Sequence, residues 1–236
     1  MLFRSAISAL SADAVDCRYV RRAAGTPTGT AVVLVDAEGR NSITVAPGAN
    51  GTVEAGDLRP ALASLPPGIL LTCFELRPAV VRAAVRMARE AGWLVIVNPA
   101  PPLAALDGTW PPGIIFTPNE HELRALDSSG QAVQAVQAAR NLGARTAGSV
   151  VATLGADGAL LVTASETTHV PAPAVSAVDT TGAGDAFNGA LASQLSLGAE
   201  LAAAVPRAVA AASLSIKRKG AREGMPTSEE LRRVSP

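Results

Sequence analysis

The sequence has 236 residues, of which 48% are hydrophobic and 17% charged, so it can bury the core of a globular protein. Basic and acidic residues number 20 each, and no long run of one sign occurs apart from the short cluster 217–219, which argues against nucleic-acid and membrane-surface partners. Cys17 and Cys73 lie far apart with no CxxC or His-rich surroundings, so we expect neither a disulfide framework nor a zinc site, and a reducing cytoplasm as the setting.

The first predicted element is a β-hairpin in residues 28–46. Its strands, Thr30–Val35 and Ser42–Ala46, are joined by Asp36–Gly39, whose glycine can adopt the positive φ of a hairpin loop. After this hairpin, strand patterns alternate with helical periodicity, which predicts a parallel sheet covered by helices. The expected strands are Ile69–Phe74, Trp93–Val97, Ile114–Phe116 and Val150–Leu154, and the expected helices are Pro78–Ala91, Glu120–Leu126 and Ala132–Leu142.

The C-terminal part predicts a second hairpin followed by two Ala-rich helices. The hairpin strands are Ala159–Val162 and Thr167–Val170, entered through the turn signal Asp157-Gly158. The last long apolar stretch, Leu201–Ile216, is interrupted by polar residues and is too short for a membrane span, so it is predicted to be a buried helix. One α/β domain over residues 1–236, with a small β flap, is the economical interpretation.

The run from Val178 to Gly189 carries the most informative chemistry. Gly182 and Gly184 stand just before a helix, where unpaired N–H groups carry partial positive charge and glycines let phosphate oxygens approach the backbone. Asp185 falls in the first helical turn, where its carboxylate can accept the proton of an attacking hydroxyl. Helix capping could explain any one of these residues. Because a cap needs only one polar side chain, capping does not account for the glycines and aspartates occurring together.

The stretch Asp179–Ala190 resembles the second signature of the PfkB or ribokinase family of carbohydrate kinases. Further stretches agree in order and approximate spacing, namely Pro27–Ala31 with Pro47–Asn50, then Asn98–Pro101, then Thr117–Glu120. The resemblance implies a ribokinase-like three-layer sandwich with a mostly parallel sheet and a small β lid. It also implies an ATP-dependent sugar kinase that phosphorylates D-ribose at O5, with Asp185 as the base and as a sugar contact, and Gly182, Ala183 and Gly184 stabilising charge.

The same resemblance gives roles to three acidic or amide side chains. Asn119 and Glu122 stand at the family's Asn-x-x-Glu motif, which implies placement of Mg²⁺, held indirectly by Glu122, and of nucleotide phosphates. Asn followed three residues later by Glu is also a capping box, and both roles can hold. Glu75 matches a sugar-contacting glutamate of ribokinases, with a solvated carboxylate at a strand end as the alternative.

Nucleotide and cation contacts are implied on further residues. For ATP they are Asn119, Thr153, Gly155, Gly158 and Gly184. For a monovalent cation, K⁺, held largely by backbone oxygens, they are Asp179, Thr181, Ser215, Arg218 and Gly220. The chain departs from the family pattern at Gly224, where ribokinases often present a hydroxyl, and this departure weakens the case for potassium.

One family feature is absent from the sequence. Ribokinase-like kinases begin with a strand that carries a sugar-binding Asp and with a Gly-Gly loop, and the sequence contains no Gly-Gly pair. The expectation is that the N-terminal strands and half of the sugar lid are missing. Three hypotheses stay open: a complete kinase whose start lies further upstream, a nucleotide-binding remnant with poor catalysis, and a relative that acts on another sugar or a nucleoside. Lids pair between subunits in the family, which implies a homodimer for the full-length protein.

Overall fold

The structure is a computed structural model that describes residues 2–35, 41–102, 106, 110–127 and 134–234. Two compact units are distinguished within the chain. The first comprises Met1–Pro66 with Glu75–Ala84, and the second comprises Pro67–Phe74 with Val85–Pro236. Helix α3 (Pro78–Glu90) begins in the first unit and ends in the second.

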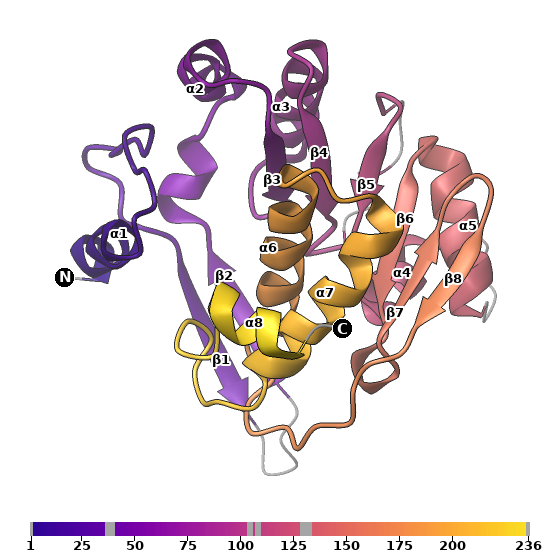
Figure 1. Cartoon of the computed structure of the whole chain (residues 1–236). Coiled ribbons are helices and arrows are strands. Elements are labelled where there is room, and N and C mark those ends of the chain that lie inside the picture. Colours follow the sequence, from indigo (N-terminus) through magenta and orange to yellow (C-terminus); the bar gives the residue numbers. More distant parts are fainter. Residues whose placement is uncertain (1, 36–40, 103–105, 107–109, 128–133, 235–236) are drawn as a thin grey trace. The chain divides into compact units, whose positions relative to one another are not determined.

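The first unit contains the predicted hairpin. Strands β1 (Thr30–Val35) and β2 (Asn41–Ala46) pair antiparallel from Thr30 opposite Ala46 to Val35 opposite Asn41, which confirms the hairpin, while its predicted loop Asp36–Gly39 lies outside the described residues. Helix α1 (Leu2–Ala12) precedes it, and two 3₁₀ turns and the short helix α2 (Arg59–Ser64) follow it (Figure 1). The 3₁₀ turns are Gly48–Thr52 and Ala55–Leu58.

Gly48 allows the segment before β1 and the segment after β2 to come close together at the base of the hairpin. Gly48 has φ +50°, and a Cβ atom there would lie 2.4 Å from Pro27 O. The amide of the next residue, Ala49, donates a hydrogen bond to the same Pro27 oxygen over 2.8 Å. Only glycine therefore lets the chain after β2 pass this close to the chain before β1.

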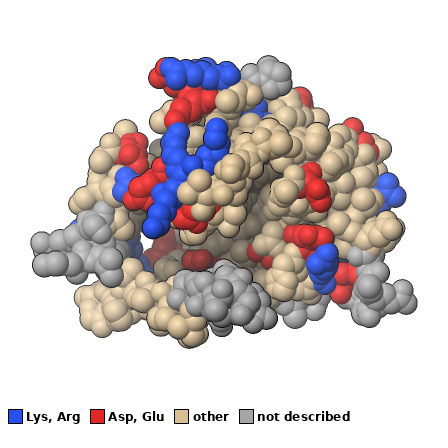
Figure 2. All heavy atoms as spheres, turned by 90° about the horizontal axis from the view of Figure 1, so that it is seen from below, with Lys and Arg blue, Asp and Glu red and all other residues tan. Residues whose placement is uncertain are grey.

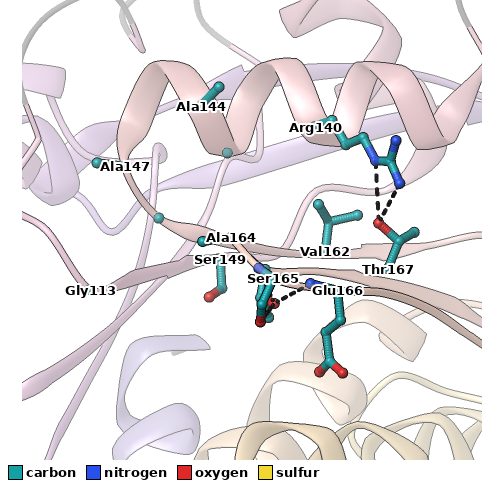
Figure 3. Close-up of a pocket in the computed structure, with 13 residues that line it drawn as sticks. Gly113, Arg140, Ala144, Ala147, Ser149, Val162, Ala164, Ser165, Glu166 and Thr167 are labelled. Carbon is teal, nitrogen blue, oxygen red and sulfur yellow. Dashed lines mark hydrogen bonds between the residues drawn. The ribbon is translucent and has the colours of Figure 1, made fainter.

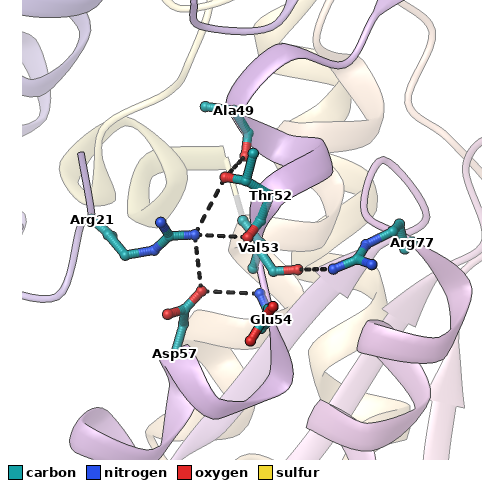
Figure 4. Close-up of polar contacts among 7 residues, drawn as sticks. All are labelled: Arg21, Ala49, Thr52, Val53, Glu54, Asp57 and Arg77. Carbon is teal, nitrogen blue, oxygen red and sulfur yellow. Dashed lines mark hydrogen bonds and ion pairs between the residues drawn. The ribbon is translucent and has the colours of Figure 1, made fainter. Parts of the chain in front are cut away.

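Arg21 joins the segment before the hairpin to the 3₁₀ turns after it (Figure 4). Its guanidinium donates to Thr52 O over 2.8 Å and forms an ion pair of 3.2 Å with Asp57. Asp57 in turn accepts a hydrogen bond from the amide of Glu54 over 3.0 Å. One arginine thus fixes both turns, because it contacts a carbonyl in the first and a carboxylate in the second.

The second unit is built on a six-stranded sheet with the order β3-β4-β5-β6-β7-β8. Pairing is parallel from β3 to β6 and antiparallel for β7 and β8, so the predicted mostly parallel sheet and the second hairpin are confirmed. The strands are β3 (Ile69–Cys73), β4 (Leu94–Asn98), β5 (Ile114–Phe116), β6 (Ser149–Thr153), β7 (Ala159–Val162) and β8 (Thr167–Val170).

Helices cover both faces of this sheet and make three layers (Figure 1). One face packs on α6 (Ala183–Ser196) and α7 (Leu201–Ser215), through a core that joins Ile96, Val151 and Leu161 to Phe187 and Leu191. Helices α4 (Glu120–Leu126) and α5 (Ala135–Thr146) contact strands β6 and β7 from the other side, and α8 (Ser228–Val234) contacts α7. Because Leu191 is fully buried, its replacement by Ala should cost about 2–5 kcal/mol.

The predicted buried helix Leu201–Ile216 corresponds to α7, whose alanines and valines lie in the core. Within the described part of the chain, no helix has the length and apolarity needed to cross a membrane. Basic and acidic side chains are interspersed on the face shown in Figure 2.

Candidate active site

The turn before α6 presents free backbone amides. Gly182 is the N-cap with φ +80°, a left-handed conformation that glycine adopts without steric cost. Helical hydrogen bonding begins with Ala186, whose amide donates to Gly182 O over 2.9 Å. The amides of Gly184 and Asp185 have no acceptor within the helix, as is general for a first turn. A Cβ atom at Gly184 would meet no other atom within 4 Å, so an anion can approach this amide closely.

Two neighbouring groups shape this turn from within. Ala183, predicted as a third amide donor, donates to Thr180 O over 3.2 Å and so is partly engaged. Asn188, which sequence reasoning did not single out, is buried and donates from Nδ2 to Gly184 O over 3.0 Å. Its Oδ1 atom is buried and has no hydrogen-bond partner among the described residues. Asn188 therefore restrains the backbone of Gly184 from the next turn of the helix.

Asp185 is exposed in the first turn of α6. No hydrogen bond or ion pair to another described residue engages its carboxylate, whereas the other aspartate of the motif, Asp179, has both oxygens engaged. An unengaged carboxylate next to free amides is the arrangement required of a general base beside a phosphoryl group. The two aspartates of one short motif thus have different surroundings.

A cavity of about 600 Å³ joins this turn to the predicted nucleotide segment. Its walls include Thr153, Gly155 and Gly158 on one side and Ala183 and Gly184 on another. Because Thr153 ends strand β6, the cavity lies at the carboxyl end of the parallel strands, where ligands of open α/β sheets bind. Four of the five residues predicted to contact the nucleotide therefore line one cavity.

The rest of the cavity wall is mostly apolar and was not predicted. One part of it consists of residues 172–175 and 177, which precede the turn. Another part includes Val209 and Ala212 of helix α7 and Ile216 just beyond that helix. Apolar walls with a few polar groups are typical of small-molecule sites. No sequence signal singled out these residues, because alanine and valine in a helix look the same whether they face a core or a cavity.

Gly155 and Gly158, both predicted as nucleotide contacts, differ in their surroundings. Gly158 has φ +91°, and a Cβ atom there would lie 2.1 Å from Val170 O and 2.5 Å from Ala172 N. Gly155 also has a positive φ, +58°, but a Cβ atom there would meet nothing within 4 Å. Gly158 is therefore required for the close passage of β8 past the turn, whereas Gly155 faces open space.

Asn119 and Glu122 form the predicted capping box at α4. The amide of Glu122 donates to Asn119 Oδ1, and the amide of Asn119 donates to Glu122 Oε2, each over 2.8 Å. Asn119 also forms an isolated parallel bridge with Thr153, which ties the capping box to the cavity wall although Asn119 does not line the cavity. Burial raises the pKa of the Glu122 carboxyl, and the hydrogen bond from the Asn119 amide partly opposes this effect.

The hydrogen bonds of the capping box leave the Glu122 carboxylate able to hold Mg²⁺ indirectly. Each oxygen of Glu122 accepts one hydrogen bond from Asn119, over 2.8 and 2.9 Å, and retains a second lone pair. Among the residues described, no group of three or more His, Cys, Asp or Glu side chains converges on one point. The residues present thus fit a Mg²⁺ ion held through water and phosphate oxygens, which is the usual manner for this ion.

The residues of the predicted potassium site are brought together, and several of the predicted ligand atoms accept hydrogen bonds from the protein itself. The segment 178–182 lies against the loop after α7, since the amides of Val178 and Asp179 donate to Ile216 O over 2.7 and 3.2 Å. However, a Cβ atom on Gly224 would lie 2.7 Å from Ser215 O and 2.8 Å from Gly220 O. Gly224 therefore lies close to both carbonyl oxygens, and its amide donates to Gly220 O over 2.9 Å, so this oxygen is already engaged.

Glu75 is exposed and follows strand β3 after one residue. It belongs to the first compact unit, as does the hairpin, whereas the turn at Gly182 belongs to the second. Its contact with a sugar remains a prediction.

A second hollow of about 630 Å³ contains none of the predicted residues (Figure 3). It is bordered by Gly113 and Ser149, at the amino ends of β5 and β6, and by the β7–β8 connection. Arg140 at its rim donates to Thr167 Oγ1 over 3.1 Å, so the guanidinium is already engaged. The amino ends of parallel strands are not where such sheets bind their ligands, so this hollow receives no role in the site.

Comparison with known proteins identifies the family of the chain. The sequence profile described as pfkB family carbohydrate kinase matches residues 4–228. A ribokinase of Mus musculus is 34% identical over 235 residues, covering 95% of this chain and 72% of that protein. A deoxyribokinase of Salmonella typhi is 34% identical over 223 residues, covering 92% and 72%. A structure of Arabidopsis thaliana ribokinase complexed with ribose and ATP is similar with a TM-score of 0.76 at 30% identity, covering 93% of this chain and 72% of that chain.

The mostly parallel sheet, the free amides before α6 and the family match together indicate an enzyme that transfers a phosphoryl group to an alcohol. The chain belongs to the pfkB family of carbohydrate kinases, as a ribokinase-type sugar kinase. The resemblance of Asp179–Ala190 to the second signature of this family, and the ribokinase-like fold expected from it, are confirmed.

Proposed function

We propose that this protein transfers the γ-phosphoryl group of ATP to O5 of D-ribose. The observation that carries the proposal is the cavity that unites the turn at Gly184 with the turn at Gly155 and Gly158. In the reaction the ribose hydroxyl oxygen forms a bond to the γ-phosphorus, its proton passes to the Asp185 carboxylate, and the bond from the γ-phosphorus to the β,γ-bridging oxygen breaks to release ADP. Positioning and charge stabilisation supply most of the rate enhancement in such transfers.

The nucleotide would lie with its base against the apolar wall near Val209 and Ala212 and its phosphates toward the α6 N-terminus. The Gly184 and Asp185 amides would stabilise the charge on the transferred group, because they are fixed donors that need no reorganisation. The A. thaliana ribokinase in the comparison was solved with ribose and ATP, which supports this pair of ligands. Magnesium, when bound, supplies positive charge to the phosphates, and Glu122 would hold it through water.

Relatives leave several sugar substrates open. The similar proteins include a ribokinase, a deoxyribokinase and an aminoimidazole riboside kinase, the last from Salmonella typhimurium at 34% identity over 239 residues. We favour D-ribose because the segments Thr28–Thr30 and Pro47–Asn50 match the ribokinase pattern. Residues 1–236 would act as one kinase domain, with the hairpin at about 28–46 as its lid and Glu75 as a sugar contact.

A homodimer through the lid belongs to the same proposal. Val32, Leu34 and Val45 of the hairpin are 55%, 65% and 61% exposed, so apolar side chains are available on both of its faces. Pairing of two such hairpins would remove these side chains from water.

The test is a coupled assay of ADP release by the 236-residue chain with ATP and magnesium, comparing D-ribose, 2-deoxy-D-ribose and aminoimidazole riboside. We expect D-ribose to give the highest kcat/KM. Asp185→Asn should lose roughly 10²- to 10⁴-fold in kcat while still binding ATP in calorimetry, since general-base catalysis contributes about this factor. Asp16→Asn, an exposed aspartate of the first unit, is the control. Turnover of the Asp185→Asn variant at the wild-type rate would exclude Asp185 as the base, and a preference for another substrate would exclude ribose.

A further inference from the structure

The loop after α7 closes on itself through Gly224. The amide of Gly224 donates to Gly220 O over 2.9 Å, and an added Cβ would lie 2.8 Å from that same oxygen. The same Cβ would lie 2.7 Å from Ser215 O, which already accepts a hydrogen bond from the Arg218 amide over 3.3 Å. Two of the carbonyl groups that would face a monovalent cation therefore already accept hydrogen bonds from backbone amides, and neither has room for a side chain at residue 224.

Both oxygens of the Asp179 carboxylate accept hydrogen bonds from backbone amides. Its Oδ1 accepts from the Thr181 amide over 3.0 Å, and its Oδ2 accepts from the Gly220 amide over 2.9 Å. Hydrogen bonds from backbone N–H groups stabilise an ionised carboxylate, as they do at a helix N-terminus. The protein thus stabilises the ionised Asp179 carboxylate through its own hydrogen bonds.

Direct contacts also join the turn before α6 to this loop. The amides of Val178 and Asp179 share Ile216 O as their acceptor, over 2.7 and 3.2 Å. A Cβ atom on Gly182 would lie 3.1 Å from the α-carbon of Ala221, so the two segments touch at the N-cap itself. The positions of Gly182 and of the amides that follow it are therefore set by protein contacts on both sides.

We infer that the backbone amides that donate to Ser215 O, to Gly220 O and to the Asp179 carboxylate take the place of a bound monovalent cation in this chain. The phosphate-binding turn is assembled without potassium, and neither folding nor turnover depends on it. The part of this inference that concerns turnover rests on the proposed function, whereas the part that concerns assembly does not.

Thermal unfolding in potassium chloride and in tetramethylammonium chloride at equal ionic strength tests the assembly. Tetramethylammonium is too large to be held by a ring of carbonyl oxygens, so the pair of salts isolates specific binding. If no cation binds specifically, the Tm values in the two salts should be equal. Binding of potassium at a hundred times its Kd would instead raise Tm by more than about 5 °C. A rise of that size in potassium would overturn the inference, whether or not the chain phosphorylates ribose.

Turnover gives the second readout. If the chain is active, kcat should be the same in the two salts, and strong activation by potassium would contradict the inference. If the chain is inactive in both salts, the proposed function fails, while equal Tm values would still support assembly without the ion.

Variants locate the effect at Gly224. Gly224→Ser must displace Ser215 O or Gly220 O, so we expect a clear loss of Tm in tetramethylammonium, part of which potassium restores by binding in the opened loop. Gly189→Ser is the matched control, because a Cβ atom there meets nothing within 4 Å. If Gly224→Ser is as stable as Gly189→Ser in both salts, the carbonyl oxygens of Ser215 and Gly220 are not in close contact with residue 224, and the inference fails.

Discussion

The carboxylate of Asp179 accepts a hydrogen bond from the backbone amide of Gly220, 2.9 Å away and 41 residues later in the sequence. Its other oxygen accepts from the amide of Thr181, within the same turn. These bonds, with that from Gly220 the strongest contributor, lower the pKa of Asp179 to about 2. The side chain is therefore ionised at neutral pH and links the turn before α6 to the loop after α7.

Asp179→Asn should weaken this link, because the amide side chain of asparagine offers only one acceptor oxygen to two N–H groups. We expect kcat of the proposed ribose phosphorylation to fall roughly 10- to 100-fold, since small displacements of a positioned group have effects of that size. The KM for ATP should change much less. Steady-state kinetics measure both, with Asp16→Asn as the control variant. Wild-type kcat in Asp179→Asn would show that the turn keeps its position without the carboxylate.

The fold was predictable where local signals agree with tertiary packing. The bounds of β5, α4, β7 and β8 were predicted without error, since each is bordered by Gly, Pro or the Asn119 capping box. The short helices α2 and α8 were not predicted, because six or seven residues give too little periodicity to recognise. Helix α5 runs four residues further than predicted and ends where Ala147 adopts φ +49°, which alanine does not signal.

The candidate site was predictable only where it is local in sequence. Two glycines and an aspartate before a helix indicate an anion site from spacing alone. The contacts of Gly224 and the pairing of Asp179 with Gly220 join distant segments through backbone atoms. Backbone contacts leave no trace in residue types, so the arrangement around the predicted potassium ligands could be read only from the structure.

Glu230 should make stability depend on pH. It accepts hydrogen bonds from the amide of Thr227 over 2.8 Å and from the Arg218 guanidinium, and these bonds lower the pKa of Glu230 to about 2 from its ordinary 4.5. Because the folded-state pKa is depressed, the contribution is complete above about pH 4.5 and is lost as the pH falls toward 2. Glu230→Gln should therefore lower Tm at about pH 6, and its deficit relative to the wild type should shrink by about pH 3.

Thermal unfolding of both proteins across this pH range provides the measurement. Glu229→Gln is the matched control, since the one ion pair of Glu229 among the described residues is with Arg233 on the exposed surface of α8, and such pairs contribute little. A Tm deficit of Glu230→Gln that stays constant with pH would refute the role assigned to the ionised carboxylate.

Arg21→Gln should loosen the two 3₁₀ turns after the hairpin. The substitution removes the bond to Thr52 O and the ion pair with Asp57 (Figure 4), at a cost of about 1 kcal/mol or less because the groups are partly exposed. Hydrogen exchange of the amides in residues 48–58 should become faster while exchange in the second unit is unchanged. Arg59→Gln, at an exposed arginine outside this set of contacts, should leave both rates unaltered. Equal exchange in wild type and Arg21→Gln would mean that the turns hold without the arginine.

Gly158→Ala and Gly155→Ala separate a structural glycine from one that faces the cavity. Both have a positive φ, which costs an alanine at least about 1–2 kcal/mol, and Gly158, with ψ −123°, lies outside the left-handed helical region in a conformation that glycine alone adopts readily. At Gly158 the added Cβ would also lie 2.1 Å from Val170 O, so the strand must shift, and overpacking of this kind costs about 1–3 kcal/mol more. In urea unfolding, we expect the free energy of unfolding of Gly158→Ala to be lower than that of Gly155→Ala by about 1–3 kcal/mol or more. ATP binding should weaken as well, because the shift moves the cavity wall at Ala172. Equal stability of the two variants would show that the β6–β7 turn can relax away from β8 without cost.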